Sequence, residues 1–175
     1  MRFSRTQING VFLVEMKQHC DQRGFFARVF CEQEFADHGL LTRFPQHSVS
    51  YNITRGTLRG MHVQHPPYGE TKLVRCTSGA IYDVVVDMRK DSKTRGRWLA
   101  FNLTAGNRRQ LYIPEGVAHG FQTLADDTEV HYLISAFHVP AAGHGFVFSD
   151  PDIGIEWPLP VSVISDKDRN LGPFR

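Results

Sequence analysis

The sequence has too few cysteines and too little net charge for several common protein classes. Its three cysteines, Cys20, Cys31 and Cys76, are widely spaced among 175 residues, and no two form a C-x-x-C pair. An odd, scattered set argues against a disulfide framework and predicts a reducing, cytoplasmic setting. The 20 Lys and Arg residues nearly balance the 18 Asp and Glu residues, so the net charge is +2. We therefore expect neither nucleic acid nor a membrane surface as a partner.

Long apolar runs and glycine-rich nucleotide loops are also missing. No stretch approaches the ~20 apolar residues of a membrane-spanning helix, and residues 1–18 lack the apolar core of a signal peptide. Neither G-x-G-x-x-G nor G-x-x-x-x-G-K-[ST] occurs, which excludes Rossmann and P-loop folds. Apolar residues make up 41% and charged residues 22%, as in ordinary globular proteins. We expect one folded domain over residues 1–175.

What the sequence does contain is a series of short segments rich in Val, Ile, Leu, Phe and Tyr, separated by turn-forming clusters. This spacing predicts an all-β sandwich or barrel. Residues 31–40 have a helical pattern that ends near a glycine, so we expect one short helix in the N-terminal part. The predicted strands are residues 72–76, 80–89, 97–104, 109–114, 118–125 and 128–137.

Several polar side chains lie inside or at the edge of strand-like segments, where alternate positions face a core. A charge buried there is costly unless it is paired, so a wet pocket at the mouth of the sandwich would accommodate them. The alternative is that each one faces solvent on an outer sheet surface. The residues concerned are Arg59, His62, Lys72, Arg75, His119, His131 and Tyr132.

His62 has two chemical interpretations. With His65 and His119 it could form the set of three protein ligands that a catalytic metal usually needs. However, His62 and His65 are three residues apart and point to opposite sides of a regular strand, and no H-x-H pair occurs. The pattern therefore favours proton transfer by His62 over metal ligation, and we expect no metal site.

Four further residues fit either a structural or a chemical role. Lys72 is a solvated edge lysine, or a cation that stabilises a developing oxyanion. Tyr132 alternates with apolar neighbours, as a core tyrosine would, and Asp168 lies in a polar turn. Arg23 is a loop arginine, or a ligand for phosphate. The residue pattern leaves these alternatives open.

Longer motifs follow one another in an order that covers nearly the whole chain. They are DQRGFF (21–26), LRGMHVQ (58–64), KLVRCTSGAIYDVVVDMR (72–89), YIPEGVAHGF (112–121), Tyr132, SDPDIGIEWP (149–158) and SDKD (165–168). In this order they resemble the dTDP-4-dehydrorhamnose 3,5-epimerase family. The resemblance implies a cupin jelly-roll β-sandwich, usually a homodimer with strands exchanged across the interface, that uses no metal or cofactor. The implied reaction inverts carbon 3, carbon 5 or both in a nucleotide-linked 4-keto-6-deoxy sugar, through an enolate.

The same resemblance implies a role for each site residue. His62 would be the base, Asp168 would fix its tautomer, Tyr132 would be the acid on the other side of the sugar ring, and Lys72 would hold the enolate oxygen. Arg23 and Arg59 would bind the diphosphate, and Phe26 would pack near the nucleobase. The implied substrate-binding residues are Arg23, Phe26, Arg28, Gln46, Ser48, Arg59, His119, Phe137 and His138.

Three departures from the family pattern motivate alternative functions. Arg28 stands where the family commonly has Glu, and Ser48 stands where Asn is usual, so another nucleobase such as that of CDP or GDP is an alternative to thymine. Residues 137–141 read FHVPA where Tyr-Tyr-x-Pro-Glu is usual, which makes single-centre epimerisation or 3,4-ketoisomerisation an alternative outcome. From other classes, a metal-dependent cupin oxygenase and a non-catalytic sugar-nucleotide binding module are the alternatives.

Overall fold

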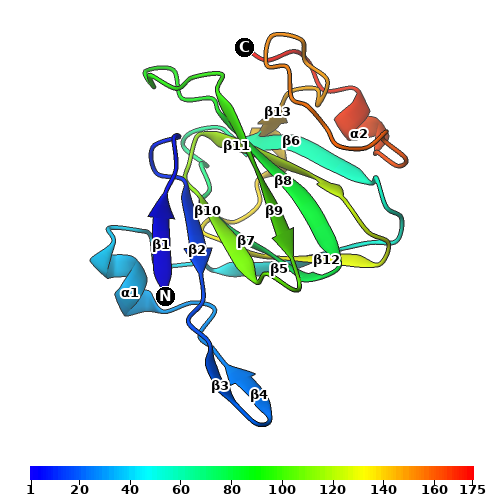
Figure 1. Cartoon of the computed structure of the whole chain (residues 1–175). Coiled ribbons are helices and arrows are strands. Elements are labelled where there is room, and N and C mark those ends of the chain that lie inside the picture. The colour runs from blue at the N-terminus through cyan, green and yellow to red at the C-terminus, as the bar shows by residue number, and fades with distance from the viewer.

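Two antiparallel sheets packed face to face form the body of the molecule (Figure 1). The computed structural model describes all residues from Met1 to Arg175. One sheet has six strands in the order β1-β2-β10-β7-β12-β5, and the other has five in the order β13-β6-β11-β8-β9. The six strands are β1 (Arg2–Arg5), β2 (Phe12–Glu15), β10 (Arg109–Ile113), β7 (Lys72–Ser78), β12 (Thr128–Ile134) and β5 (Gln46–Asn52). The five strands are β13 (Gly143–Gly145), β6 (Leu58–Gln64), β11 (Val117–Thr123), β8 (Ala80–Asp87) and β9 (Trp98–Thr104).

The predicted β-sandwich is confirmed, and so are the six strands predicted over residues 72–137, with ends that differ by a few residues. The predicted helix over 31–40 is confirmed as the shorter α1 (Glu32–Asp37). The prediction of a single helix is wrong, because Asp166–Arg169 forms a second one, α2, and Pro140–Ala142 forms a 3₁₀ turn, η1. No helix of the chain has the length and apolar character needed to cross a bilayer.

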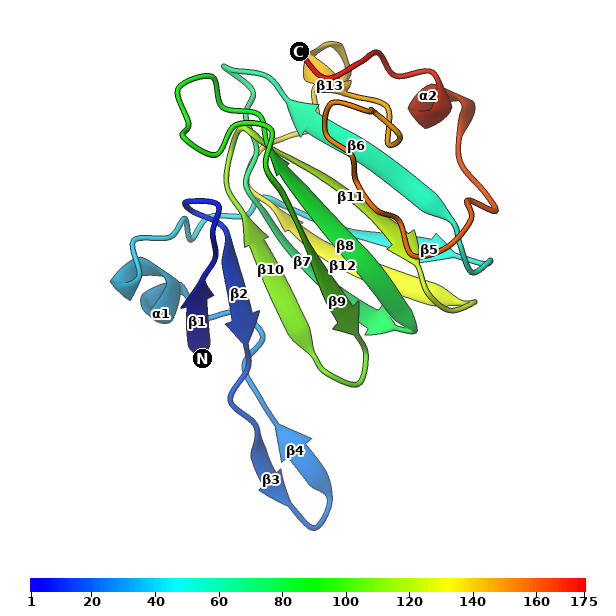
Figure 2. The ribbon, with the colours of Figure 1, turned by 45° about the horizontal axis from the view of Figure 1, so that its top comes forward.

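Three apolar clusters account for the layering, because side chains on successive positions of a strand face opposite ways. Between the sheets, residues such as Val74, Leu111 and Phe121 form the central core. The outer face of the six-stranded sheet is covered around Phe35 of α1, and the outer face of the five-stranded sheet is covered around Phe146 of the C-terminal segment (Figure 2). Each sheet is thus partly covered on its outer face.

A β-bulge between β6 and β11 determines which side chains face the space between the sheets. His119 pairs with His62 and Phe121 pairs with Arg59, so β6 has one more residue than β11 over this stretch. The strands approach closely there: a Cβ on Gly60 would lie 2.6 Å from the Cα of Gly120, and Gly60 has a φ of +131°. The extra residue lets Arg59 and His62, three positions apart, face the same cavity.

A two-stranded hairpin, β3 (His19–Asp21) and β4 (Gly24–Phe26), extends away from the body (Figures 1 and 2). Every residue of both strands is exposed, and the Phe26 side chain is 72% exposed. A phenylalanine in this position leaves most of its apolar surface uncovered by its own chain.

Candidate active site

A cavity of about 280 Å³ opens between the two sheets beside the central core, and both sheets contribute polar side chains to it. The five-stranded sheet contributes Arg59 and His62 from β6, and His119 and Phe121 from β11. The six-stranded sheet contributes Ser48, Val49 and Ser50 from β5, Lys72 from β7, and Tyr132 and Ile134 from β12. The sequence did not decide whether the polar strand residues face a pocket or solvent. Most of them line this one cavity.

His62 is held by a buried carboxylate from the far end of the chain. Its Nε2 lies 2.7 Å from Oδ1 of Asp168, while the other carboxylate oxygen accepts the Gly60 N–H at 3.1 Å. Asp168 is 5% exposed, so it is not a solvated turn residue. Burial alone would raise the pKa of Asp168, but the hydrogen bonds from His62 and Gly60 lower it below its ordinary value. With Nε2 donating to this carboxylate, the Nδ1 atom of a neutral His62 ring carries the lone pair that can accept a proton.

Tyr132 lies on β12, opposite the histidines across the cavity. Its ring is edge-on to that of His119, with 6.2 Å between centroids, and it packs against the central core. Desolvation raises the pKa of Tyr132 well above its ordinary value, and the negative charge of Asp83 adds to the rise. The residue is therefore a neutral phenol that can donate a proton near neutral pH.

Lys72 faces the same cavity at the start of β7, and it is paired. Its Nζ lies 2.8 Å from Oε1 of Glu70, and both side chains are 12% exposed. Lys72 is therefore not a solvated edge lysine. A cation held at the wall of a poorly solvated cavity is well placed to stabilise negative charge on a bound molecule.

His119 forms a second histidine–carboxylate pair, deeper than the first. Its Nε2 lies 2.7 Å from Oδ1 of Asp83, which is completely buried, and the other oxygen of Asp83 has no hydrogen-bond partner. Neither Asp83 nor Glu70 was predicted from the sequence. Asp83 could have been found from its position in AIYDVVVDMR, where it occupies the same strand face as Ile81 and Val85.

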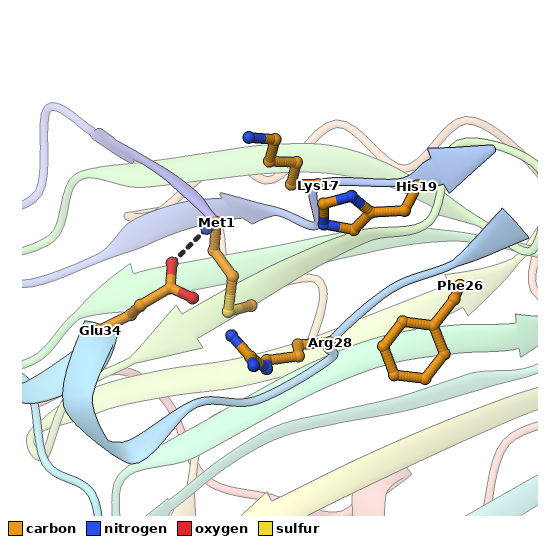
Figure 3. A pocket seen from close by; sticks show the side chains of 6 residues that line it. All are labelled: Met1, Lys17, His19, Phe26, Arg28 and Glu34. Carbon is orange, nitrogen blue, oxygen red and sulfur yellow. Dashed lines mark hydrogen bonds and ion pairs between the residues drawn. The ribbon is translucent and has the colours of Figure 1, made fainter.

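Six of the nine expected substrate-binding residues do not line this cavity within one chain, and three of the six lie in residues 23–28. Arg23 is at the tip of the hairpin, where its side chain is 87% exposed and pairs with Asp21. Phe26 and Arg28 line a different cavity of about 460 Å³ near the N-terminus (Figure 3). The other residues around that cavity are Met1, Lys17, His19 and Glu34, and the Met1 amino group pairs with Glu34.

The remaining expected binding residues meet near the rim. Gln46 accepts a hydrogen bond from the His138 N–H at 2.9 Å, and Phe137 is 67% exposed. The next N–H group, of Val139, donates to the buried Gln64 side chain at 2.9 Å. Residues 137–139 are thus attached to β5 and β6 by two glutamine side chains, although none of them lines the cavity of His62.

The three histidines considered as metal ligands do not converge. His65 faces a different cavity, lined also by Arg89 and Lys90, and its ring lies 4.0 Å from that of His144. His62 and His119 are instead each bonded to their own carboxylate. The chain contains no group of three metal-ligating side chains, so the alternative of a metal-dependent oxygenase has no ligand set here.

A cupin-type sandwich whose cavity gathers two carboxylate-bound imidazoles, an ammonium group and a phenol defines a class of isomerase that moves protons to and from carbon. Comparisons with known proteins agree. The family model for dTDP-4-dehydrorhamnose 3,5-epimerase matches residues 5–175, and the chain belongs to this family.

Relatives match over nearly their full length. The dTDP-4-dehydrorhamnose 3,5-epimerase of Methanothermobacter thermautotrophicus is 44% identical, covering 99% of this chain and 95% of the relative. The crystal structure of the 3,5-epimerase from Elizabethkingia anophelis is 33% identical and superposes with a TM-score of 0.96, covering 99% of this chain and 96% of that one. A dTDP-4-dehydrorhamnose 3-epimerase from Streptomyces niveus is 36% identical, covering 97% of this chain and 82% of the relative.

Proposed function

We propose that this protein epimerises carbons 3 and 5 of a dTDP-linked 4-keto-6-deoxy sugar. One observation carries the proposal: His62, Lys72 and Tyr132 line one cavity, with the histidine on one sheet and the other two on the facing sheet. The relatives named above carry dTDP-linked substrates in their names, which supports the choice of nucleotide.

The chemistry follows from the carbonyl group of the sugar. A ketone at carbon 4 acidifies the hydrogens on carbons 3 and 5. Nδ1 of His62 removes such a proton, the electron pair passes into the enolate, and Asp168 stabilises the imidazolium that forms. Lys72 stabilises the enolate oxygen, and Tyr132 donates a proton to the opposite face of the same carbon. The centre is thereby inverted, and the tyrosinate and imidazolium return to their starting states by exchange with solvent.

Solvent deuterium tests this proposal directly. The protein would be incubated in D₂O with 4-keto-6-deoxy sugars linked to dTDP, CDP or GDP, and deuterium incorporation at carbons 3 and 5 followed by NMR. We expect exchange at both carbons, fastest with the dTDP-linked sugar. Exchange at one carbon alone would identify a single-centre epimerase, and movement of the carbonyl to carbon 3 would identify a ketoisomerase. No exchange with any of the three nucleotides would contradict the proposal.

We also infer that two copies of the chain form a dimer through the hairpin. Strand β5 is a free edge of the six-stranded sheet, where Val49 and Tyr51 are 58% and 53% exposed, and Ile53, directly after the strand, is 72% exposed. The hairpin presents the exposed Phe25 and Phe26. Pairing a partner's hairpin with this edge would bury both apolar surfaces. Since Val49 lines the catalytic cavity, the same pairing would bring the partner's copies of Arg23 and Phe26 close to it.

Co-expression of two inactive variants tests whether the site is shared between chains. We expect His62→Ala and Arg23→Ala each to be impaired alone. In a mixed dimer, one of the two sites would contain both changes and the other neither, so random pairing should restore about a quarter of wild-type activity. A mixture no more active than its components would show that each chain has its own complete site. Analytical ultracentrifugation would give the oligomeric state.

We further propose a cytoplasmic location. All three cysteines are free thiols, and Cys20 is exposed on the hairpin. A compartment that keeps thiols reduced is consistent with this state.

A further inference from the structure

The ion pair behind Lys72 belongs to a longer chain of side-chain contacts. Glu70 precedes β7 and does not line the cavity, yet its Oε1 lies 2.8 Å from the Lys72 ammonium group. Its other oxygen accepts a hydrogen bond from Nε2 of Gln64 at 3.1 Å. Both oxygens of this carboxylate, which is 12% exposed, therefore have partners.

Both polar atoms of the Gln64 side chain also have hydrogen-bond partners. Its Nε2 also donates to the Tyr68 carbonyl at 3.0 Å, and its Oε1 accepts the Val139 N–H at 2.9 Å. The side chain is 3% exposed and lies at the end of β6, two positions after His62. One continuous set of bonds thus links residue 139 at the rim to the ammonium group in the cavity.

A lysine needs such support if it is to stabilise a charge that exists only briefly. Its four-carbon stem has many rotamers, and fixing them costs conformational free energy each time the group must point at one atom. A carboxylate fixed from behind by Gln64 limits the positions of the ammonium group before the substrate arrives. An electrostatic contribution prepared in this way requires no rearrangement when the enolate forms.

We propose that Glu70 is a positioning residue for the enolate-stabilising Lys72, and that Gln64 holds Glu70 in place. This role rests on the proposed function, because it concerns the charge that develops on the sugar oxygen. Glu70 itself does not contact the reacting atoms. Because it acts through Lys72, its loss should affect the chemical step more than substrate binding.

A double-mutant cycle with Glu70→Gln and Lys72→Met tests the proposal. With the dTDP-linked 4-keto sugar, E70Q should lower kcat for deuterium exchange by about 10–100-fold, below the 10²–10³-fold typical of losing a direct oxyanion donor. KM should change by less than about threefold, as expected for an interaction made mainly in the transition state. In the K72M background, adding E70Q should change kcat by no more than about twofold, because the two residues act as one unit.

Glu15→Gln is the matched control, since Glu15 is also an ion-paired carboxylate, with Arg2 and Arg109, but lies on β2, away from the cavity. Its kcat should equal that of wild type. Glu70→Asp retains the charge with a shorter side chain, and it should also lower kcat. This variant replaces E70Q in the test if thermal unfolding shows that E70Q folds poorly. An unchanged kcat in folded E70Q or E70D, or equal losses in both backgrounds of the cycle, would overturn the proposal. Inactive wild-type protein would instead contradict the proposed epimerase function.

Discussion

His62→Ala is expected to lower the rate of deuterium exchange by about 10²–10⁴-fold, the range typical of losing a general base. The reason is geometric: the Asp168 carboxylate holds Nε2 at 2.7 Å and thereby directs the opposite ring nitrogen to the cavity. Nucleotide binding should persist, because Arg59 and the other binding groups remain. The measurements are NMR exchange with the dTDP-linked sugar and calorimetric titration with dTDP.

His65→Ala is the matched control for this change. It removes the same side chain three positions along the chain, but His65 is exposed and lies beside His144 in another cavity. We expect wild-type exchange from it. If His62→Ala retained the exchange activity of the wild type, the assignment of the base would be wrong. If the wild type itself bound dTDP and exchanged nothing, the non-catalytic binding module would be the better interpretation.

Tyr132→Phe should separate removal of the proton from its return. With His62 intact, the enolate still forms, and the imidazolium can return a deuteron to the face from which the proton left. We therefore expect deuterium to enter the substrate without inversion, while the inverted product forms about 10²–10⁴-fold more slowly. NMR coupling constants distinguish the two species, because they report the configuration at each carbon.

Tyr82→Phe serves as the control for loss of a phenolic hydroxyl group. Tyr82 packs against Trp157 on the outer face of the five-stranded sheet, away from the cavity. The control should invert the sugar at the wild-type rate. Because Tyr132 also packs against the central core, thermal unfolding of both variants should be compared. Normal inversion by a folded Tyr132→Phe variant would exclude this residue as the acid.

The strands of residues 72–134 were predictable because each contains enough β-branched and aromatic residues to be recognised from its own composition. The strands β1 to β5 and β13 were not predicted. Of these, β1, β3 and β4 are three or four residues long and contain no fully buried side chain, so their own composition holds little signal. Pairing with a neighbouring strand, which no local pattern reports, defines them.

The site was predictable in its types of residue more than in its geometry. The role of Asp168 came from a family motif, since its partner His62 is 106 positions away and its burial depends on that contact. From the sequence alone, the Lys72 side chain could face either solvent or the cavity. Which of the two it faces depends on its ion pair with Glu70 and on the packing of β7. The β-bulge that turns Arg59 and His62 to one side is also invisible in a strand pattern of period two.

His62 lies on one sheet and Tyr132 on the facing sheet, so their proposed roles would make the stereochemical outcome a consequence of the layered architecture. The gap between the two side chains is the cavity of about 280 Å³ that both sheets line. A ketone in that gap would lose a proton to one wall, and the flat enolate that results would gain a proton from the other wall. Inversion would then need no separate recognition of the product's configuration, because delivery from the second wall can produce no other isomer.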